Sequence, residues 1–411
     1  ISTGAVAIDG VEIVAVGPRV ELLERFPNAN VEDFGEAAIL PGFVNCHSHL
    51  EITGMRGSLD AVEHDFGAWL LKLNALRGAM SEDDIKAAAI AGAREGAAAG
   101  VTCFGDIGRF GFAGLYALKT VGLRGVLYQE TEFSADDRTA DDAFEQLKDK
   151  FLGLREQQTE LVEAGLSPHS PYTVSRKLFE KIARFAIDET VKVSIHAAES
   201  TDEENLVRKG NGFFRSLMDR FEVEWQSPRC SSVEYLLQTG ILETKPLLAH
   251  CVTVSDTDIE LIASSGTSVA HCPKSNAKFG HGYAPFEKFL DARIAVGLGS
   301  DSVASNNVCD LLEESRFAAF SARNRHGRSR FVTAREVLTA ITLGGARAMR
   351  LDDSIGSLEA GKQADITVVS LAHLAQQPVT DVEAGLVFSS NARDILMTMV
   401  AGTAVHRSGI N

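Results

Sequence analysis

The stretch Leu40-Pro-Gly-Phe-Val-Asn-Cys-His-Ser-His-Leu50 decides how the fold of this chain is interpreted. An apolar run follows the Pro-Gly pair and ends at His47 and His49. Residues two apart in a β-strand point to the same face, so both imidazoles lie on one side of the strand. Two neutral imidazoles on one face form half of a metal site. The stretch therefore predicts a buried strand that delivers two metal ligands at its end.

The same arrangement recurs along the chain. Seven more apolar runs each end in a residue capable of chemistry, and segments long enough for helices separate them. The predicted strands span residues 42–45, 101–105, 123–129, 165–168, 191–195, 246–249, 267–270 and 294–300, and the residues at their ends are His47 with His49, Asp106, Glu130, His169, His196, His250, His271 and Asp301. Eight alternating strand and helix units predict an α/β fold of the (β/α)₈ TIM-barrel type, with the active site at the C-terminal ends of the strands.

Helix signals support this alternation in the middle of the chain. Helices are predicted over residues 82–99, 176–190, 256–264 and 334–349, and the residues expected to cap their N-termini are Ser81, Ser175, Ser255 and Thr333. Both ends of the chain instead carry short β-type runs with turn glycines. The ends are therefore expected to be rich in β-structure and the middle to form the barrel.

Composition excludes several classes of function. The 411 residues hold 40 Lys and Arg against 56 Asp and Glu, which gives a net charge of −16. Such acidity argues against binding to nucleic acid or to anionic lipid, because both need a basic surface. No apolar window is long enough to span a membrane, and no signal peptide is visible, so a cytoplasmic protein is expected. The six cysteines form no disulfide framework and are expected to be reduced and buried.

His196 and Asp301 are candidates to complete a metal site with His47 and His49. Three imidazoles and one carboxylate suit Zn²⁺ or Fe²⁺ and leave a position for water, whereas Ca²⁺ and Mg²⁺ prefer all-oxygen shells. Glu199 follows His196 by three residues. Its carboxylate is either an ordinary surface group at the start of a loop or a proton shuttle beside the water of the metal site.

At these residues the sequence resembles the amidohydrolase superfamily, and within it the branch that contains cytosine deaminase-like and triazine hydrolase-like enzymes. The resemblance covers about residues 36 to 370. The motifs that carry it are residues 40–50, Ser167-Pro-His-Ser-Pro-Tyr172, His196-Ala-Ala-Glu199, Leu248-Ala-His-Cys251, His271-Cys-Pro-Lys-Ser-Asn276, residues 297–306 and residues 356–365.

The resemblance implies a role for each strand-end residue. One divalent metal ion, Zn²⁺ or Fe²⁺, would be held by His47, His49, His196 and Asp301. Glu199 would protonate the substrate ring, His250 would hold and polarise the attacking water, and Asp301 would accept the proton of that water. His169 would contact the substrate. Binuclear relatives carry a carboxylated lysine at the position of His169, so a single metal is expected here.

The resemblance also implies the domain organisation. The barrel would span residues 41–350, and a small β-sandwich-like domain would combine residues 1–40 with 351–411. The family often forms dimers or larger assemblies, so a homo-oligomer is expected.

The implied reaction is hydrolytic deamination of an aminated aromatic heterocycle, with metal-bound hydroxide as the nucleophile. Several segments look most like the aminodeoxyfutalosine deaminases, which act on an adenine-nucleoside derivative. The expected substrate contacts are His169, Glu51, Trp69, His271, Asn276 and Ser305. A triazine chlorohydrolase or aminohydrolase and a cyclic-amide hydrolase are alternatives on the same site. A non-enzymatic scaffold protein is a further alternative. Such proteins usually lose the metal-ligating residues, whereas this sequence keeps every one.

Overall fold

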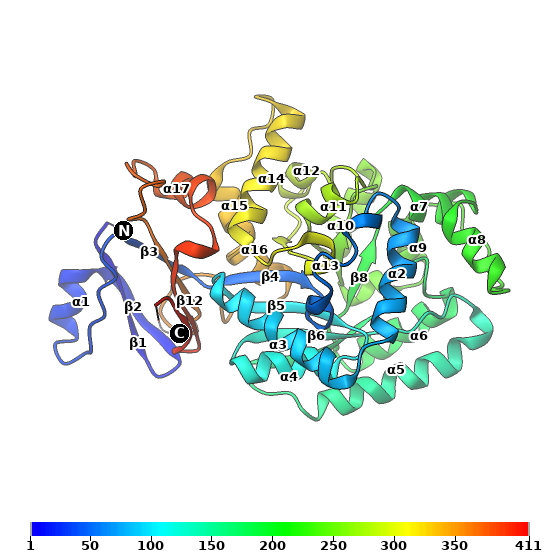
Figure 1. Ribbon diagram of the computed structural model, residues 1–411, viewed down its shortest axis with the longest axis horizontal. Coiled ribbons are helices and arrows are strands. Elements are labelled where there is room, and N and C mark those ends of the chain that lie inside the picture. Colours follow the sequence, from blue (N-terminus) through cyan, green and yellow to red (C-terminus); the bar gives the residue numbers. More distant parts are fainter. Residues whose placement is uncertain (1, 410–411) are drawn as a thin grey trace.

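The eight strands predicted for the middle of the chain form the barrel (Figure 1). The computed structural model describes residues 2–409. Two four-stranded parallel sheets, in the orders β4-β5-β6-β7 and β11-β10-β9-β8, are joined by bridges from Ser48 to Asp301 and from Leu166 to Val193. The barrel strands are β4 (Phe43–Ser48), β5 (Val101–Gly108), β6 (Arg124–Glu130), β7 (Val162–Ser167), β8 (Ser194–Ala197), β9 (Leu247–His250), β10 (Ser268–His271) and β11 (Val296–Leu298).

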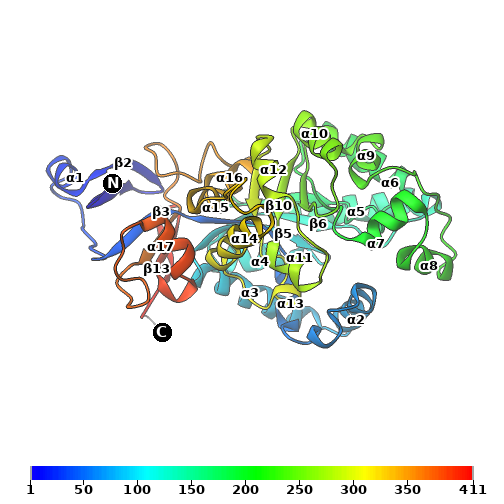
Figure 2. The same cartoon turned by 90° about the horizontal axis from the view of Figure 1, so that it is seen from above.

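Helices surround the barrel strands, as the two views at right angles show (Figures 1 and 2). The helices of this part of the chain are α2 (Phe66–Gly78), α3 (Glu82–Ala98), α4 (Phe112–Val121), α5 (Ala140–Arg155), α6 (Arg176–Asp188), α7 (Thr201–Glu204), α8 (Phe213–Arg220), α9 (Ser232–Gln238), α10 (Asp256–Ser265), α11 (Pro273–Lys278), α12 (Phe286–Asp291), α13 (Val303–Asn306), α14 (Leu311–His326), α15 (Ala334–Ala340) and α16 (Leu343–Ala348). The barrel is confirmed, and it brings the ends of all eight strands to one face of the molecule.

The four predicted helix caps are confirmed, since each side chain accepts a backbone N–H bond at the start of its helix. The single helix predicted over residues 334–349 is wrong in one respect, because Thr342 divides it into α15 and α16. Thr342 leaves the helical region, with φ −125° and ψ −104°. Its hydroxyl donates to the carbonyl of Leu338 at 2.7 Å, a local bond that competes with continuation of the helix.

Segments from both ends of the chain pack together beside the barrel. The hairpin of β1 (Gly4–Asp9) and β2 (Glu12–Pro18) lies next to a sheet of order β14-β13-β12-β3 (Figure 1). That sheet contains β3 (Ala37–Pro41), β12 (Ile366–Ser370), β13 (Ile395–Val400) and β14 (Thr403–Arg407), and α1 (Arg19–Arg25) and α17 (Val382–Ser389) flank these strands. Ile13, Ile366 and Met397 share one buried apolar cluster.

The division into residues 1–40 with 351–411 and residues 41–350 stays a prediction, and Ile1 and residues 410–411 lie outside the described part of the chain. Over residues 2–409, no helix is both long enough and apolar enough to cross a membrane.

A buried ion pair fixes the terminal β-structure to the barrel. Arg124, at the start of β6, donates from Nε and Nη2 to both carboxylate oxygens of Asp365, at 2.8 and 3.1 Å. The two side chains are only 7% and 1% exposed. Removing one partner leaves the other charge buried, which costs about 3–5 kcal/mol.

We therefore expect Asp365→Ala to lower the free energy of unfolding, measured by urea denaturation, by about 3–5 kcal/mol. A suitable control is Glu189→Ala, which breaks the half-exposed pair with Arg155 and should cost less than about 1 kcal/mol. Equal losses in the two variants would contradict the role assigned to Asp365.

Candidate active site

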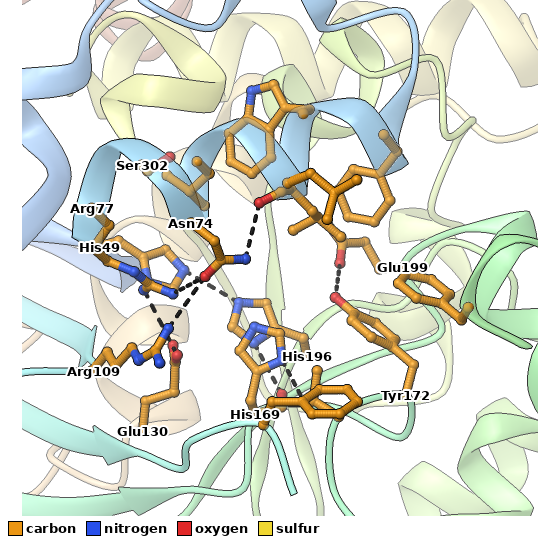
Figure 3. A pocket seen from close by; sticks show the side chains of 18 of the residues that line it. His49, Asn74, Arg77, Arg109, Glu130, His169, Tyr172, His196, Glu199 and Ser302 are labelled. Carbon is orange, nitrogen blue, oxygen red and sulfur yellow. Dashed lines mark hydrogen bonds and ion pairs between the residues drawn. The ribbon is translucent and has the colours of Figure 1, made fainter. Parts of the chain in front are cut away.

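Most of the strand-end residues line one cavity of about 1060 Å³, a volume that includes its opening to solvent (Figure 3). They are His49, Glu130, His169, His196, His250 and Asp301. Side chains of α2 and α8 form part of its wall. Tyr172 stacks on Phe214 with ring centroids 4.0 Å apart, and Phe66 meets Phe279 edge to face at 5.3 Å. Apolar ring faces of this kind suit a flat aromatic ligand.

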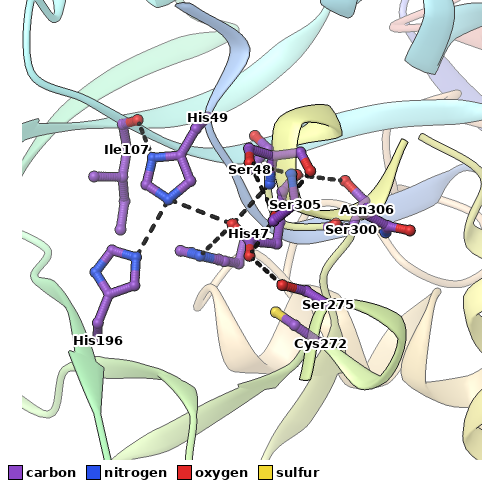
Figure 4. Close-up of polar contacts among 12 residues, drawn as sticks. His47, Ser48, His49, Ile107, His196, Cys272, Ser275, Ser300, Ser305 and Asn306 are labelled. Atoms are coloured by element: carbon purple, nitrogen blue, oxygen red, sulfur yellow. Dashed lines mark hydrogen bonds and ion pairs between the residues drawn. The ribbon is translucent and has the colours of Figure 1, made fainter. Parts of the chain in front are cut away.

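A cluster of imidazoles and one carboxylate lies at the floor of the cavity (Figure 4). His49 Nε2 is 3.2 Å from His196 Nε2 and 3.6 Å from Asp301 Oδ1. His47 Nε2 is 3.5 Å from the same carboxylate oxygen. Burial lowers the pKa of His49 to about 4 and that of His196 well below its usual range. The imidazoles are therefore neutral at neutral pH, the form in which they bind metals.

The residues fit a divalent metal ion. His47 is fully buried, and neither of its ring nitrogens has a hydrogen-bond partner among the described residues. His49 and His196 donate from Nδ1 to the carbonyls of Ile107 and His169, at 3.0 and 3.1 Å. These bonds fix the tautomer that leaves Nε2 free as a ligand. The ligand atoms of His47, His49 and Asp301 all lie within 4.8 Å of one another.

Asp301 is held by hydroxyls and a backbone amide. Its Oδ2 accepts hydrogen bonds from Ser275 and Ser305, at 2.6 and 2.8 Å, and Oδ1 accepts one from the Ser302 amide at 2.7 Å. Burial by itself raises the pKa of Asp301, but the neighbouring His47, whose Nε2 is 3.5 Å from Oδ1, lowers it well below its usual range. Asp301 also has φ +55°, a strained conformation for a non-glycine residue. The carboxylate is thus ionised and directed at the histidines.

Glu199 faces the cavity beside the histidine cluster. Its Oε1 is 3.6 Å from His250 Nε2, and its Oε2 accepts a hydrogen bond from the Tyr172 hydroxyl at 3.5 Å. Burial raises the pKa of Glu199 to about 7. The carboxylate of Glu203 accepts from the backbone amides of Ala198 and Glu199, which fixes the loop that carries the side chain. Glu199 is therefore poised to exchange a proton near neutral pH.

His250 is oriented by Asn276. Its Nδ1 donates to Asn276 Oδ1 at 2.9 Å, so Nε2 points towards Glu199. Burial by itself lowers the pKa of His250, but the charges of Glu199 and Asp301 raise it above its usual value. The ring lies 5.3 Å from that of His47, centroid to centroid, and belongs to a second group with His47 and His196 that is able to hold a metal.

The six expected substrate contacts divide into two groups. His169 and Trp69 line the cavity. Glu51, His271, Asn276 and Ser305 lie behind its wall. Glu51 accepts from the amides of Arg109 and Phe110, and the His271 ring stacks on Phe286. Direct contact with substrate stays a prediction for all six residues. In the second group, Asn276 accepts a hydrogen bond from His250, and Ser305 donates one to Asp301.

Sequence reasoning missed much of the wall. Asn74 and Arg77 from α2, and Phe213 and Phe214 from α8, line the cavity without having been identified. Both helices follow barrel strands as insertions, and no strand-end pattern indicates which of their faces turns inward. The aromatic pair Phe213-Phe214 directly after Gly212 is a sequence signal that could have indicated such a wall.

The fold and the site together define a metal-dependent hydrolase built on a barrel. Residues 38–405 match the model of the Amidohydrolase family, and the chain belongs to this family. It is an enzyme that acts on carbon–nitrogen bonds other than peptide bonds, and it uses a divalent metal ion. The resemblance on which the sequence analysis relied is confirmed.

Individual relatives are similar over nearly the whole chain. A 5-methylthioadenosine/S-adenosylhomocysteine deaminase from Pelotomaculum thermopropionicum is 31% identical, covering 98% of this chain and 88% of that protein. An adenosine deaminase from Xanthomonas campestris with bound zinc is 26% identical, with a TM-score of 0.87, covering 99% and 90% of the two chains. The atrazine chlorohydrolase TrzN from Arthrobacter aurescens, with zinc, is 25% identical, with a TM-score of 0.83 and coverage of 99% and 92%.

Proposed function

We propose that this enzyme hydrolyses the exocyclic amine of an adenine nucleoside and releases ammonia. The observation that carries the proposal is the buried Glu199, with a pKa near 7, between the histidine cluster and an aromatic wall. A proton donor beside a metal centre suits attack of water on a nitrogen heterocycle. The names of the similar deaminases support adenine nucleosides as the class of substrate.

We propose His47, His49, His196 and Asp301 as the metal ligands and Zn²⁺ as the metal. Bound zinc in two similar structures supports this choice. When bound, a divalent cation lowers the pKa of water and so supplies a nucleophile at neutral pH. Metal analysis of the purified protein distinguishes zinc from iron, which the same ligands also suit.

The side chains of this chain carry out the proton transfers. Glu199 donates a proton to the ring nitrogen next to the carbon that bears the amine, so charge does not accumulate on the ring. His250, fixed by Asn276, orients the attacking water. Asp301 accepts one proton of the water and passes it to the departing amine. The second proton of the water leaves as the carbonyl group forms and returns to Glu199, which regenerates the acid. The balance is one water consumed, one C–O bond formed, one C–N bond broken and one ammonia released.

An ammonia-release assay tests the proposal. Protein reconstituted with zinc is offered adenosine, 5′-methylthioadenosine, S-adenosylhomocysteine, aminodeoxyfutalosine, guanine, cytosine and atrazine. We expect ammonia from adenine nucleosides and none after chelation of the metal. For atrazine the release of chloride or alkylamine is measured instead. Such release with no ammonia from any adenine nucleoside would contradict the proposal and favour the triazine hydrolase alternative.

We also propose a homo-oligomer, which family resemblance supports, and a cytoplasmic location. Light scattering coupled to size-exclusion chromatography tests the first, with a mass above 44.1 kDa as the expected result.

A further inference from the structure

Glu130 is a buried carboxylate with unused hydrogen-bonding capacity. It ends β6, its side chain is only 7% exposed, and it lines the active-site cavity (Figure 3). Its carboxylate accepts no hydrogen bond from any residue between 2 and 409, and the nearest cationic atom, Arg77 Nη1, is 3.8 Å away. Both carboxylate oxygens reach the cavity, so a ligand bound there is placed to supply the hydrogen-bond donors.

Both arginines near Glu130 donate to other residues, and only Nε of Arg77 is buried without a partner among residues 2–409. Arg109 pairs through Nη2 with Glu132 and donates from Nη1 to Asn74 Oδ1 at 3.2 Å. Arg77 donates from Nη2 to the same Asn74 oxygen at 3.0 Å.

The charges at this end of the cavity balance. Arg77 Nη1 lies 3.6 Å from Glu51 Oε1 and 3.8 Å from Glu130 Oε1, and Glu132 pairs with both Arg109 and Lys150. With no net positive charge to attract an anion, a carboxylate that faces the cavity suits neutral donors such as hydroxyl groups.

Glu130 lies on the side of the cavity away from the proton-transfer residues. His250 ends β9, and Glu199 and Asp301 follow β8 and β11 of the same sheet, whereas Glu130 ends β6 in the sheet β4–β7. Figure 3 places Arg77, Arg109 and Glu130 at one end of the cavity and Glu199 and Tyr172 at the other. A substrate whose reacting carbon sits beside Glu199 therefore reaches Glu130 with its remote part.

We propose that Glu130 accepts hydrogen bonds from the sugar hydroxyl groups of the substrate, so that the enzyme selects ribonucleosides. This inference rests on the proposed function, in which the adenine ring lies at the Glu199 end. The other end of the cavity then binds the ribose, and Asn74 with the two arginines fixes its polar wall.

Steady-state kinetics of the zinc-loaded enzyme test the inference with adenosine, 2′-deoxyadenosine, 3′-deoxyadenosine and adenosine 5′-monophosphate. Loss of a hydrogen bond to a charged acceptor should lower kcat/KM for a deoxynucleoside by about 10- to 100-fold, mainly through a higher KM. In Glu130→Ala the difference between adenosine and its deoxy analogues should shrink to about twofold. Glu130→Gln keeps the shape of the side chain and one acceptor oxygen. Its preference for adenosine over the deoxy analogues should therefore lie between that of the unmodified enzyme and that of Glu130→Ala.

Glu163→Gln is the matched control, because Glu163 lies on the neighbouring β7 and pairs with Lys192 near the surface. It should keep the selectivity of the unmodified enzyme. Equal kcat/KM for adenosine and both deoxynucleosides in the unmodified enzyme would overturn the inference while leaving the deaminase function intact. Preference for the monophosphate, lost in Arg77→Ala, would overturn it in favour of an anion site. Absence of ammonia from every adenine compound would overturn the proposed function as well.

Discussion

Glu199→Gln is expected to lower kcat by about 10²- to 10⁴-fold while the metal content stays unchanged. The amide has nearly the same shape as the carboxyl group but does not transfer a proton. Glu199 touches His250 and Tyr172 and none of the proposed ligands, so the metal site should persist. Ammonia release and metal analysis on the same preparation separate the two effects.

Glu204→Gln is the control for this variant, because Glu204 ends the adjacent helix α7, is partly exposed and pairs with Arg208. It should retain normal turnover. Full activity of Glu199→Gln would exclude Glu199 as the proton donor. Loss of metal together with activity would instead assign the residue a structural role in the metal site.

The pH dependence of kcat follows from the same side chain. Burial raises the pKa of Glu199 to about 7, and a proton donor acts only in its protonated form. The protonated fraction falls as the pH rises through 7, so kcat should decline on the alkaline side. A pH–rate profile measures this descent, and the residual activity of Glu199→Gln should lack it.

His47→Ala is expected to abolish measurable turnover and to weaken metal binding by more than about 100-fold, the upper range found for changes beyond the direct ligands. His47 is fully buried, and both of its ring nitrogens lack a hydrogen-bond partner among residues 2–409. An unpaired imidazole in this position is costly unless it binds an ion. Metal content after dialysis, measured by mass spectrometry of the dissolved metal, checks the result.

The control is His406→Ala on β14, outside the barrel, which should keep one metal per chain. Circular dichroism establishes that the His47 variant is folded. Normal metal content in folded His47→Ala would remove His47 from the proposed ligands.

The sequence predicted the barrel because its signals are local and repeated. Each buried strand is a short apolar run. A polar residue follows at the end of the strand, where the side chain is no longer enclosed by the apolar core. The helix caps at Ser81 and Thr333 were equally predictable, since a cap involves residues only three apart. The helix break at Thr342 was not predictable from the sequence, because it depends on one hydroxyl group competing for a backbone carbonyl within the helix.

The candidate site was only partly predictable. The spacing of His47 and His49 on one strand is a local property, so their shared face could be inferred from the sequence. The positioning roles of Asn276 and Ser305 could not, because each acts on a side chain from another part of the chain: Asn276 on His250, and Ser305 on the carboxylate of Asp301.

The sequence by itself determined the barrel, the strand-end histidines and carboxylates and the family to which the chain belongs. The tertiary structure alone decided that Glu130 faces the cavity without a hydrogen-bond partner among residues 2–409, while Arg77 and Arg109 both donate to Asn74. The physical reason is that burial and pairing depend on contacts between strands and helices distant along the chain. A carboxylate at a strand end looks the same in sequence whether its neighbours satisfy it or leave it for a ligand.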